Sequence, residues 1–542
     1  MSIRTTSPEH SDARLRSYRS LIGDKDVDGV GWVYTVSSRA LLEDVFTSVS
    51  LKRRLERDPD ADVMRHPYVV GRCAVAGPAD IDAAVEAAAT AAPAWAATPL
   101  ARRLDFGRRF RERLIAHWDE MLDLLVAEAH PRTVAGWELS CLLQVLSEEN
   151  LAWYGHQLST EFVHGQRRLT VRRLPDGVVV VNPPQNAPAP SAALALLSVI
   201  AGNTVVVRAP RSIALSTMHL VRELVAPVLQ DLNAPPGTVN VICGKPVEVM
   251  DRWLAHPLVD DVFYFGGTEE GMRVQRACVE RGKKPVLELA GNDGLVVWRD
   301  ADLALAAEAI TESFVGSGQI CMVPNYVVAH PAIADELMAL VCREAARIRP
   351  GFPQDEGVLL APVRRSERFF ALLADAVEQG ATIVCGGRRI EVDGTPSDSG
   401  VFLEPTVVRV DGLAGARQLD VVRHETFFPL LPVIVPAAGD SDEDLLDLVL
   451  TFVNENEYGL RNSLWSRSDE VIGAFVDRVH NGGLLKVNDS HIGFLPYLPT
   501  HGGTGLTSGA LGEANYPVLS TTHVQGVSVS TGISPRQAAF GH

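Results

Sequence analysis

The spacing of apolar and polar positions changes several times along the chain. From Pro78 to about residue 154, apolar residues, many of them alanine, recur at the spacing of amphipathic helices. Beyond residue 176, short valine-rich runs alternate with segments of helical period. Such runs are typical of parallel strands that helices cover on both faces. We expect strands at residues 177–181, 204–207, 238–242, 262–265 and 286–289, with helices at 212–229 and 268–281.

A second α/β region follows from Leu295 to about Thr500. Its expected strands lie near residues 326–329, 382–384 and 431–435. Two further segments, 167–173 (RRLTVRR) and 521–530 (TTHVQGVSVS), also read as strands but have no obvious partner in a compact domain. Exposed strand edges seek pairing, so we expect a projecting ribbon that pairs within a homodimer or homotetramer.

The first 70 residues carry little pattern. Their densest feature is the mixed-charge run at residues 51–62 (LKRRLERDPDAD), which predicts a solvated helix or loop without a chemical role. With 542 residues the chain is too long for one ordinary core, so two or three domains are expected.

Charge and cysteine content exclude several classes of function. The net charge of −17 argues against nucleic acid or an anionic membrane as the main partner, because both need cationic patches. The polar N-terminus has no apolar signal-peptide core, and proline and serine interrupt the longest apolar stretch, so no membrane span is expected. The seven cysteines are scattered, without CxxC pairs or metal-ligand spacing. We therefore expect a cytoplasmic protein with unpaired cysteines and no metal.

Five short segments carry the candidate chemistry, and their order matters. They are NPPQNAP at residues 182–188, GNTVVVRAPR at 202–211, FYFGGTEEG at 263–271, VLELAG at 286–291 and GSGQIC at 316–321. Each segment alone is a weak signal. Together, at this spacing, they resemble the aldehyde dehydrogenase superfamily from about residue 78 to 529. Glu425 with Phe427, NENEYGL at 454–460, Asn488 and HGGTGLTSGALGE at 501–513 extend the resemblance.

Cys321 is the predicted nucleophile. A carbonyl carbon gives up hydride only after it becomes tetrahedral, and a thiolate can attack it to form a thiohemiacetal. Cys321 follows two glycines and Gln319 in a turn, whereas the alternative, a small buried core cysteine, suits the other six. The oxyanion needs aimed donors, which Asn186 and the Cys321 N–H would supply. Asn186 between prolines is also a common turn residue, and that role is compatible with donation.

Glu288 is the predicted base for thioester hydrolysis. It stands inside an apolar strand, where burial would raise its pKa toward the range that suits a base near neutrality. The alternative is a carboxylate on a polar strand face. Relatives that pass the thioester to coenzyme A lack this glutamate, so its presence argues against an acylating aldehyde dehydrogenase or thioester reductase. A non-catalytic binding protein on the same scaffold is disfavoured because both Cys321 and Asn186 are present.

A nicotinamide cofactor is implied by the same resemblance. Gly266, Gly267, Thr268 and Gly271 lie between a strand and a helix, where backbone N–H groups can bind pyrophosphate. The resemblance implies that Glu425 holds the nicotinamide ribose and that Phe427 lies beside the ring, although core packing is an alternative for Phe427.

Two arginines bear on the choice of cofactor. Arg208 takes the place of the family's ribose-binding lysine, and Arg211 falls where many NAD-using members carry glutamate. Two guanidiniums without a carboxylate favour the 2′-phosphate of NADP over NAD. The alternatives are that Arg211 points to solvent, or that Arg208 binds ribose in either cofactor.

The substrate pocket is expected to depart from the family. Ala187 replaces an aromatic residue of the Pro-Trp-Asn-Phe-Pro turn and should open the substrate funnel. Ile320 and Met322 flank the nucleophile and favour an apolar chain or ring, while Asn488 and Phe494 are expected near the entrance. These departures leave the aldehyde itself open.

The resemblance implies an α/β fold with three parts. They are a Rossmann-type cofactor domain at residues 71–160 and 176–289, an α/β catalytic domain at 290–515 and a small β oligomerisation arm at 161–175 and 516–532. Residues 1–70 form an N-terminal extension.

Overall fold

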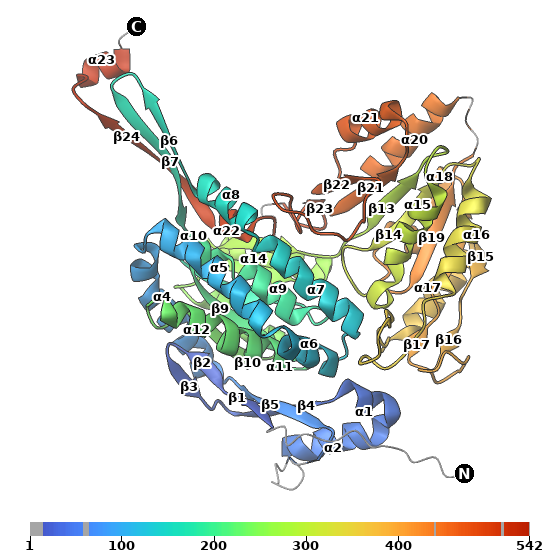
Figure 1. Ribbon diagram of the computed structural model, residues 1–542, viewed down its shortest axis with the longest axis horizontal. Coiled ribbons are helices and arrows are strands. Elements are labelled where there is room, and N and C mark those ends of the chain that lie inside the picture. The colour runs from blue at the N-terminus through green and yellow to red at the C-terminus, as the bar shows by residue number, and fades with distance from the viewer. Residues whose placement is uncertain are drawn as a thin grey trace.

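Two α/β units lie side by side, each made of one sheet with its covering helices; they are called the first and second layers below. A narrow β arm projects from the first layer (Figure 1). The computed structural model describes residues 15–57, 64, 66–437, 439, 441–510 and 514–540. The α/β prediction with a Rossmann-type parallel sheet is confirmed. Residues 511–513 of the predicted C-terminal motif and residues 58–62 of the charged run lie outside the described residues.

The first sheet is built on the five predicted valine-rich strands, which run parallel and are buried because both of their faces are covered. In spatial order the path is β1-β5-β10-β9-β8-β11-β12. The core strands are β8 (Val178–Asn182), β9 (Thr204–Pro210), β10 (Val239–Gly244), β11 (Asp261–Phe265) and β12 (Lys284–Glu288).

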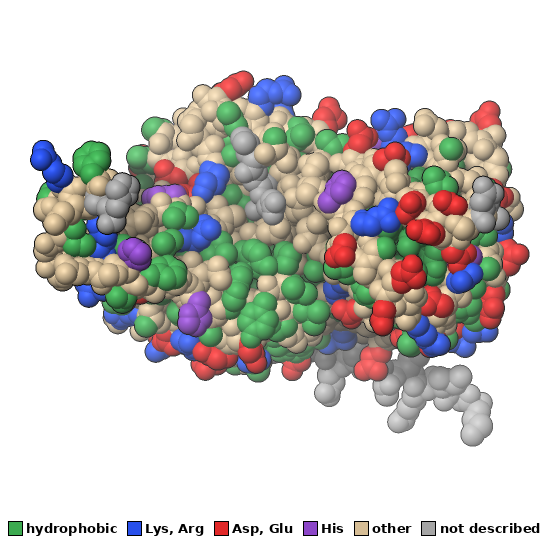
Figure 2. Space-filling view, turned by 90° about the horizontal axis from the view of Figure 1, so that it is seen from above, with side chains coloured by type: hydrophobic (Ala, Val, Ile, Leu, Met, Phe, Trp, Pro, Cys, Tyr) green, Lys and Arg blue, Asp and Glu red, His purple; other side chains and the backbone are tan. Residues whose placement is uncertain are grey.

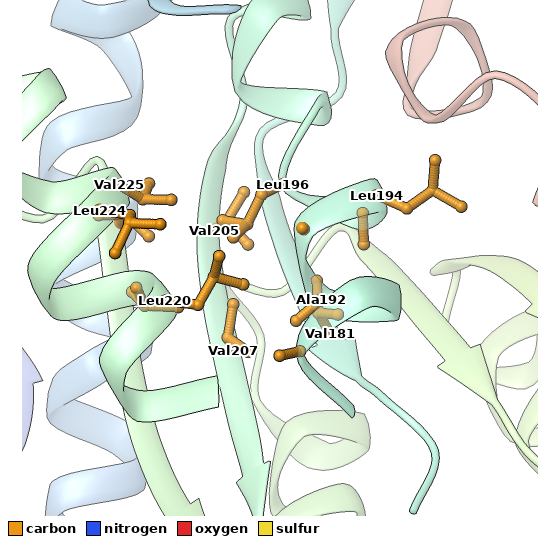
Figure 3. Close-up of a cluster of buried hydrophobic side chains, with 14 of the residues drawn as sticks. Val181, Ala192, Leu194, Leu196, Val205, Val207, Leu220, Leu224 and Val225 are labelled. Atoms are coloured by element: carbon orange, nitrogen blue, oxygen red, sulfur yellow. The ribbon is translucent and has the colours of Figure 1, made fainter. Parts of the chain in front are cut away.

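Helices cover both faces of this sheet. On one face, side chains of β8 and β9 pack against those of the following helices in a buried apolar cluster that includes Val181, Val205 and Leu220 (Figure 3). The helices of the first layer are α4 (Pro78–Ala96), α5 (Leu100–Ala116), α6 (Trp118–Ala127), α7 (Arg132–Val145), α8 (Glu148–Leu158), α9 (Pro188–Ala195), α10 (Ser198–Ala201), α11 (Leu215–His219), α12 (Ala226–Asp231), α13 (Pro246–Ala255) and α14 (Thr268–Glu280).

The helix expected at residues 212–229 is interrupted. Its middle, η1 (Leu220–Val225), is a π-helix between α11 and α12. Pro227 follows directly and has no N–H to donate, so the regular hydrogen-bond ladder is broken at this point.

The N-terminal segment contributes strands that its sequence pattern did not predict. β1 (Arg16–Tyr18), β2 (Ser20–Ile22) and β3 (Lys25–Val27) have only three residues each, which is too short for a readable alternation. β2 pairs with β10, while β1 and β4 (Gly31–Val36) pair with β5 (Val69–Val75). Between β4 and β5 lie α1 (Ser38–Glu43) and α2 (Val45–Arg57), and α2 includes the first part of the charged run.

The second sheet has seven strands in the order β15-β18-β19-β14-β13-β21-β22. They are β13 (Asp293–Val297), β14 (Pro324–Ala329), β15 (Thr382–Cys385), β18 (Thr406–Asp411), β19 (Leu430–Val435), β21 (Arg461–Trp465) and β22 (Leu484–Val487). Its helical segments are α15 (Leu303–Ile310), η2 (Thr311–Gly318), α16 (Ala334–Ala345), α17 (Ser366–Glu378), α18 (Leu413–Ala416), α19 (Asp420–Arg423), α20 (Asp442–Asn454) and α21 (Asp469–Arg478). The three strands predicted here, now β14, β15 and β19, are confirmed.

The remaining elements are short, apart from those of the arm. They are the paired strands β16 (Arg389–Ile390) with β17 (Phe402–Leu403) and β20 (Tyr458–Gly459) with β23 (Thr504–Gly505), and the helices α22 (Pro517–Ser520) and α23 (Pro535–Phe540).

The arm is a three-stranded antiparallel sheet. β7 (Arg167–Pro175) lies between β6 (Ser159–His164) and the C-terminal strand β24 (Thr522–Ser530). The two predicted ribbon strands are therefore partners of each other. The arm extends away from both layers, so most of its side chains are exposed (Figure 1).

The prediction of unpaired cysteines is wrong for two residues. Cys342 on α16 and Cys385 on β15 form a disulfide, with Cα atoms 6.1 Å apart. They are 43 residues apart in sequence, and only the packing of α16 beside the edge strand brings them together, so spacing gave no signal. Four of the other cysteines are buried, as predicted for core residues.

Acidic side chains gather over the second layer when the molecule is seen from above (Figure 2). Among the described residues, no helix has the length and apolar character needed to cross a membrane.

Candidate active site

A tight turn presents Cys321 between the two layers. The turn begins in the last residues of η2, where Gly316, Ser317 and Gly318 all have left-handed φ values. At Gly318 (φ 69°) a Cβ atom would lie 2.2 Å from the carbonyl oxygen of Phe428, so glycine is required. Cys321 therefore lies in a turn, as predicted, and its side chain is partly exposed.

Glu288 ends β12 and points toward this turn. Its side chain is 2% exposed, and its Oε2 accepts a hydrogen bond from the Gly502 N–H at 2.5 Å. Its Oε1 has no hydrogen-bond partner among the described residues. Burial raises the pKa of Glu288 well above its usual range, although the Gly502 N–H opposes the shift. A carboxyl that holds its proton toward neutrality is suited to proton transfer.

The thiol of Cys321 lies in a similar electrostatic environment. Burial raises its pKa well above the usual range, and the Glu288 carboxylate adds to the effect. The resting side chain is therefore a thiol, which must lose its proton before it attacks a carbonyl. Acceptors are close: Cys321 Sγ, a carboxylate oxygen of Glu288 and a ring nitrogen of His501 all lie within 4.8 Å of one another.

His501 was not among the predicted site residues. Its Nδ1 lies 3.0 Å from Thr500 Oγ1, and its ring makes edge contacts with Phe265 and Phe494. Burial lowers its pKa to about 3, so the imidazole is neutral near pH 7. It directly precedes Gly502, the residue that binds Glu288, but no sequence motif links the two positions in advance.

A buried arginine, Arg461, binds the backbone of the segment that carries His501. Arg461, at the start of β21, is 2% exposed and donates to the carbonyl oxygens of His491 (2.8 Å) and Thr500 (2.5 Å). The Asp293 carboxylate accepts from the Arg461 backbone N–H and lies 3.3 Å from His491 Nε2. Arg461 thus fixes the chain next to His501, and it was also missed because its partners are distant in sequence.

Asn186 comes from the loop after β8 and reaches the same turn. Its Nδ2 donates to the carbonyl oxygen of Gln319 at 3.0 Å. The neighbouring Ala187 is the N-cap of α9 and is partly exposed. The predicted donor and nucleophile are therefore on adjoining loops.

An apolar lining surrounds Cys321. Ile320 (9% exposed) and Met322 (5%) pack with side chains from α7, from the residue between β20 and β21, and from the residues after β22. The set is Val134, Trp137, Val315, Ile320, Met322, Val323, Leu359, Leu460, Ile492 and Phe494. Asn488, which was expected at the entrance, instead hydrogen-bonds through its side chain to both backbone groups of Ser466. That pairing gives Asn488 a structural role at the end of β21.

The glycine-rich turn between β11 and α14 is formed as expected. Gly267 is the N-cap of α14, and a Cβ there would meet no atom within 4 Å, so the turn borders open space. At Gly271 a Cβ would lie 2.1 Å from Leu289, so the helix packs tightly on the sheet. Thr268 Oγ1 donates to the Leu506 carbonyl at 3.4 Å. Backbone N–H groups at the start of a 13-residue helix can receive a phosphate.

Glu425 and Phe427 lie across from this turn in the second layer. Glu425 Oε1 accepts from the Gly291 N–H at 3.2 Å, and burial raises its pKa to about 8. Phe427 has φ 60°, which is rare for a bulky residue and typical of functional loops. Glu425 also borders a cavity of about 370 Å³. The other residues that line this cavity come from α17, α19 and His424, and none comes from the glycine turn. The open turn and the start of α14 are the features that can receive the phosphates of a dinucleotide.

Comparison with known proteins agrees with this geometry. The model of the aldehyde dehydrogenase family matches residues 63–520. The chain belongs to the aldehyde dehydrogenase family. It is therefore an NAD(P)-dependent oxidoreductase of the class that converts aldehydes to carboxylic acids.

Individual relatives of this aldehyde dehydrogenase cover most of the chain. It is 32% identical over 428 residues to vanillin dehydrogenase of Pseudomonas fluorescens, covering 76% of this chain and 83% of that protein. It is 29% identical over 394 residues to the NADP⁺ succinate-semialdehyde dehydrogenase of Escherichia coli, with coverages of 71% and 77%. The solved NAD-dependent aldehyde dehydrogenase of Sinorhizobium meliloti has the same fold, with a TM-score of 0.78, 22% identity and 98% coverage of each chain.

The two arginines predicted to bind cofactor differ in this aldehyde dehydrogenase. Arg208 is 3% exposed, and its guanidinium donates to Asn182 Oδ1 and to the carbonyl oxygens of Pro183 and Gly244. Arg211 follows β9, is partly exposed, and has no ion-pair partner within 4.0 Å among the described residues. Arg211 is therefore the more available of the two for a ligand.

Proposed function

We propose that this enzyme oxidises an aldehyde through a covalent intermediate on Cys321. The proposal rests on the distance of at most 4.8 Å between Cys321 Sγ and a carboxylate oxygen of Glu288. In the first step Glu288 takes the thiol proton and the sulfur attacks the carbonyl carbon. Asn186 Nδ2–H and the Cys321 backbone N–H then donate to the oxyanion, for which Asn186 gives up its bond to the Gln319 carbonyl.

The thioester is then hydrolysed by the same chain. A bound nicotinamide would supply the hydride acceptor for the tetrahedral carbon, and a thioester would then remain on Cys321. Glu288 first releases the proton that it took from the thiol to solvent; its carboxylate then removes a proton from water, and the hydroxide attacks the thioester carbon. The C–S bond breaks, the acid leaves, and the sulfur regains its proton. The raised pKa of Glu288 suits both proton transfers.

A panel of aldehydes tests this reaction. Reduced nicotinamide and free carboxylic acid should form in equal amounts with water as the acceptor, and coenzyme A should not raise the rate. An acyl-coenzyme A product, or a strict requirement for coenzyme A, would instead assign the acylating reaction.

We infer an apolar, aromatic aldehyde as the substrate class. The side chains of Trp137, Ile320, Met322 and Phe494 would present apolar surface to a substrate ring. Vanillin dehydrogenase, the 32% identical relative, is named for an aromatic aldehyde. Benzaldehyde should give a kcat/KM at least about tenfold higher than succinate semialdehyde, because a carboxylate would be desolvated unpaired in this lining. Equal or reversed values would contradict the assignment.

We further propose a preference for NADP over NAD. Arg211 takes the position next to β9 from which the adenosine ribose is read, and an arginine there suits a 2′-phosphate. A second cation is near: burial lowers the pKa of Lys52 on α2, and the charges of Arg364 and Arg211 lower it further, against Glu56. Like charges that crowd together favour an anion between them.

The Arg211→Glu enzyme should shift the ratio of kcat/KM for NADP to that for NAD by at least about tenfold toward NAD. One charge-assisted hydrogen bond is worth about 1.5–3 kcal/mol, and the new carboxylate would repel the phosphate. Steady-state kinetics with both cofactors measure the ratio, and Arg349→Glu, an exposed charge reversal elsewhere, is the control. A wild type that prefers NAD would refute the assignment of Arg211.

We propose that the arm joins at least two chains. β6 leaves one edge of the arm sheet open within the described residues, and its Phe162 and Val163 are 52% and 84% exposed. Light scattering at micromolar concentration should give at least twice the chain mass of 58.6 kDa. Val163→Asp should weaken this association, whereas Val377→Asp, an exposed valine on α17, should not. A monomeric wild type would refute the proposal.

A further inference from the structure

Three side chains with metal-binding atoms converge at the reactive sulfur. Cys321, Glu288 and His501 offer a sulfur, a carboxylate oxygen and an imidazole nitrogen, all within 4.8 Å of one another. These are the three donor types that Zn²⁺ takes in proteins. In a tetrahedral zinc site, neighbouring donor atoms lie about 3.3–3.6 Å apart, so the three side chains need to converge by roughly 1–1.5 Å at most.

The Glu288 carboxylate gives independent support for a ligand at this position. Glu288 is 2% exposed, and its Oε1 has no hydrogen-bond partner among the described residues. A buried polar atom without a partner is costly, so it favours any ligand that can reach it. Oε2 is already held by the Gly502 N–H, which fixes the carboxylate plane and leaves Oε1 as the available donor.

The imidazole is also held in place. His501 Nδ1 lies 3.0 Å from Thr500 Oγ1, which leaves Nε2 as the coordinating nitrogen. The ring packs edge-on against Phe265 and Phe494, at centroid distances of 6.2 and 5.9 Å. A ligating histidine whose other nitrogen is hydrogen-bonded is the common arrangement in metal sites.

Charge favours a cation at this position. The carboxylates of Glu425 and Asp293 act on Cys321 together with Glu288, and Arg461 opposes them. A dication bound here would attract these carboxyls in their ionised forms, and Arg461 would oppose it. The partly exposed Cys321 leaves access for the ion and for a water molecule as a fourth ligand.

We propose that Cys321, His501 and Glu288 bind one Zn²⁺ ion and that this binding reversibly inactivates the enzyme. The S–H bond of Cys321 breaks, an S–Zn bond forms, and the proton passes to solvent, with no change of oxidation state. The inactivation rests on the proposed role of Cys321 as nucleophile, because the metal occupies the sulfur lone pair. The binding itself does not depend on that role.

Cobalt provides a readout that is separate from activity. The full-length enzyme titrated with Co²⁺ should develop the visible bands of four-coordinate cobalt and a near-ultraviolet thiolate-to-cobalt band, both saturating at one ion per chain. Zn²⁺ should displace the cobalt and abolish aldehyde oxidation, and a chelator should restore the activity. Cobalt binding without a thiolate band would overturn the proposal.

Variants assign the ligands. Cys321→Ala should remove the thiolate band, and His501→Phe and His501→Gln should each weaken Zn²⁺ inhibition and Co²⁺ affinity by at least about tenfold. His480→Gln, at an exposed histidine on the second layer, should behave as the wild type. If Zn²⁺ inhibits both His501 variants as strongly as it inhibits the wild type, the proposed zinc site is refuted. Cobalt binding in an enzyme that oxidises no aldehyde would overturn the proposed function alone.

Discussion

The Cys321→Ala enzyme should lose aldehyde oxidation by about 10⁴-fold or more while binding its cofactor as the wild type does. Without the sulfur no thiohemiacetal forms, and no other described cysteine lies beside Glu288 and Asn186. Loss of a covalent nucleophile costs factors of this size in other enzymes. Reduced nicotinamide formation measures the first quantity, and calorimetric titration with the oxidised cofactor measures the second.

A matched cysteine makes the experiment specific. Cys73 on β5 is 1% exposed and lies in the hydrophobic core of the first layer. Cys73→Ala should retain most of the wild-type turnover, with at most a loss of stability from the lost packing. Substantial turnover by the Cys321→Ala enzyme would remove Cys321 from the mechanism.

The Glu288→Gln enzyme should release one equivalent of reduced cofactor per active chain and then stall. The neutral amide of this variant cannot accept a proton from water, so the thioester persists, whereas the partly exposed Cys321 thiol can still lose its proton to solvent before the first attack. Rapid-mixing kinetics should show the burst, and mass spectrometry of the intact protein should show the acyl group. Steady turnover without a burst would mean that Glu288 is only a strand residue.

The pH dependence of kcat in the wild type should also report the ionisation of Glu288. Glu288 acts on water only when deprotonated, and its pKa is raised by burial. Steady-state kcat should therefore rise with pH through that raised pKa, and the rise should be absent from the residual rate of Glu288→Gln.

The contribution of Glu288 to the free energy of unfolding should change with pH in the opposite direction. A carboxyl with a raised folded-state pKa loses its stabilising contribution as pH rises through that value, so the glutamine variant should lose less stability at high pH.

The amino-acid sequence predicted those features of the fold and of the site that depend on neighbouring residues in the chain. The buried strands β8 to β12 are mainly apolar runs, most valine-rich in β8 and β9, and a sheet covered on both faces favours that composition. Cys321 and Asn186 were predicted because their short motifs match the family pattern in order, and the glycine and proline residues of those motifs indicate turns.

Residues whose roles depend on distant partners were missed. His501 meets Glu288 and Cys321 only after both layers have packed, and Arg461 joins the carbonyls of His491 and Thr500. Asn488, an expected pocket residue, also makes side-chain hydrogen bonds to Ser466 just after β21, a partner that its sequence context did not indicate. The N-terminal strands escaped notice because three residues carry no period.

The arm has a consequence for the order in which the chain can fold during synthesis. Arg172 on β7 hydrogen-bonds to Gln525 on β24, which is 353 residues later. While the ribosome makes the residues between them, the β6–β7 hairpin has one unpaired edge on each side and displays Phe162 and Val163 to surrounding proteins. Pairing this distant in sequence forms slowly and late. Nascent chains released before residue 522 should therefore be the species that chaperones retain and that aggregate first.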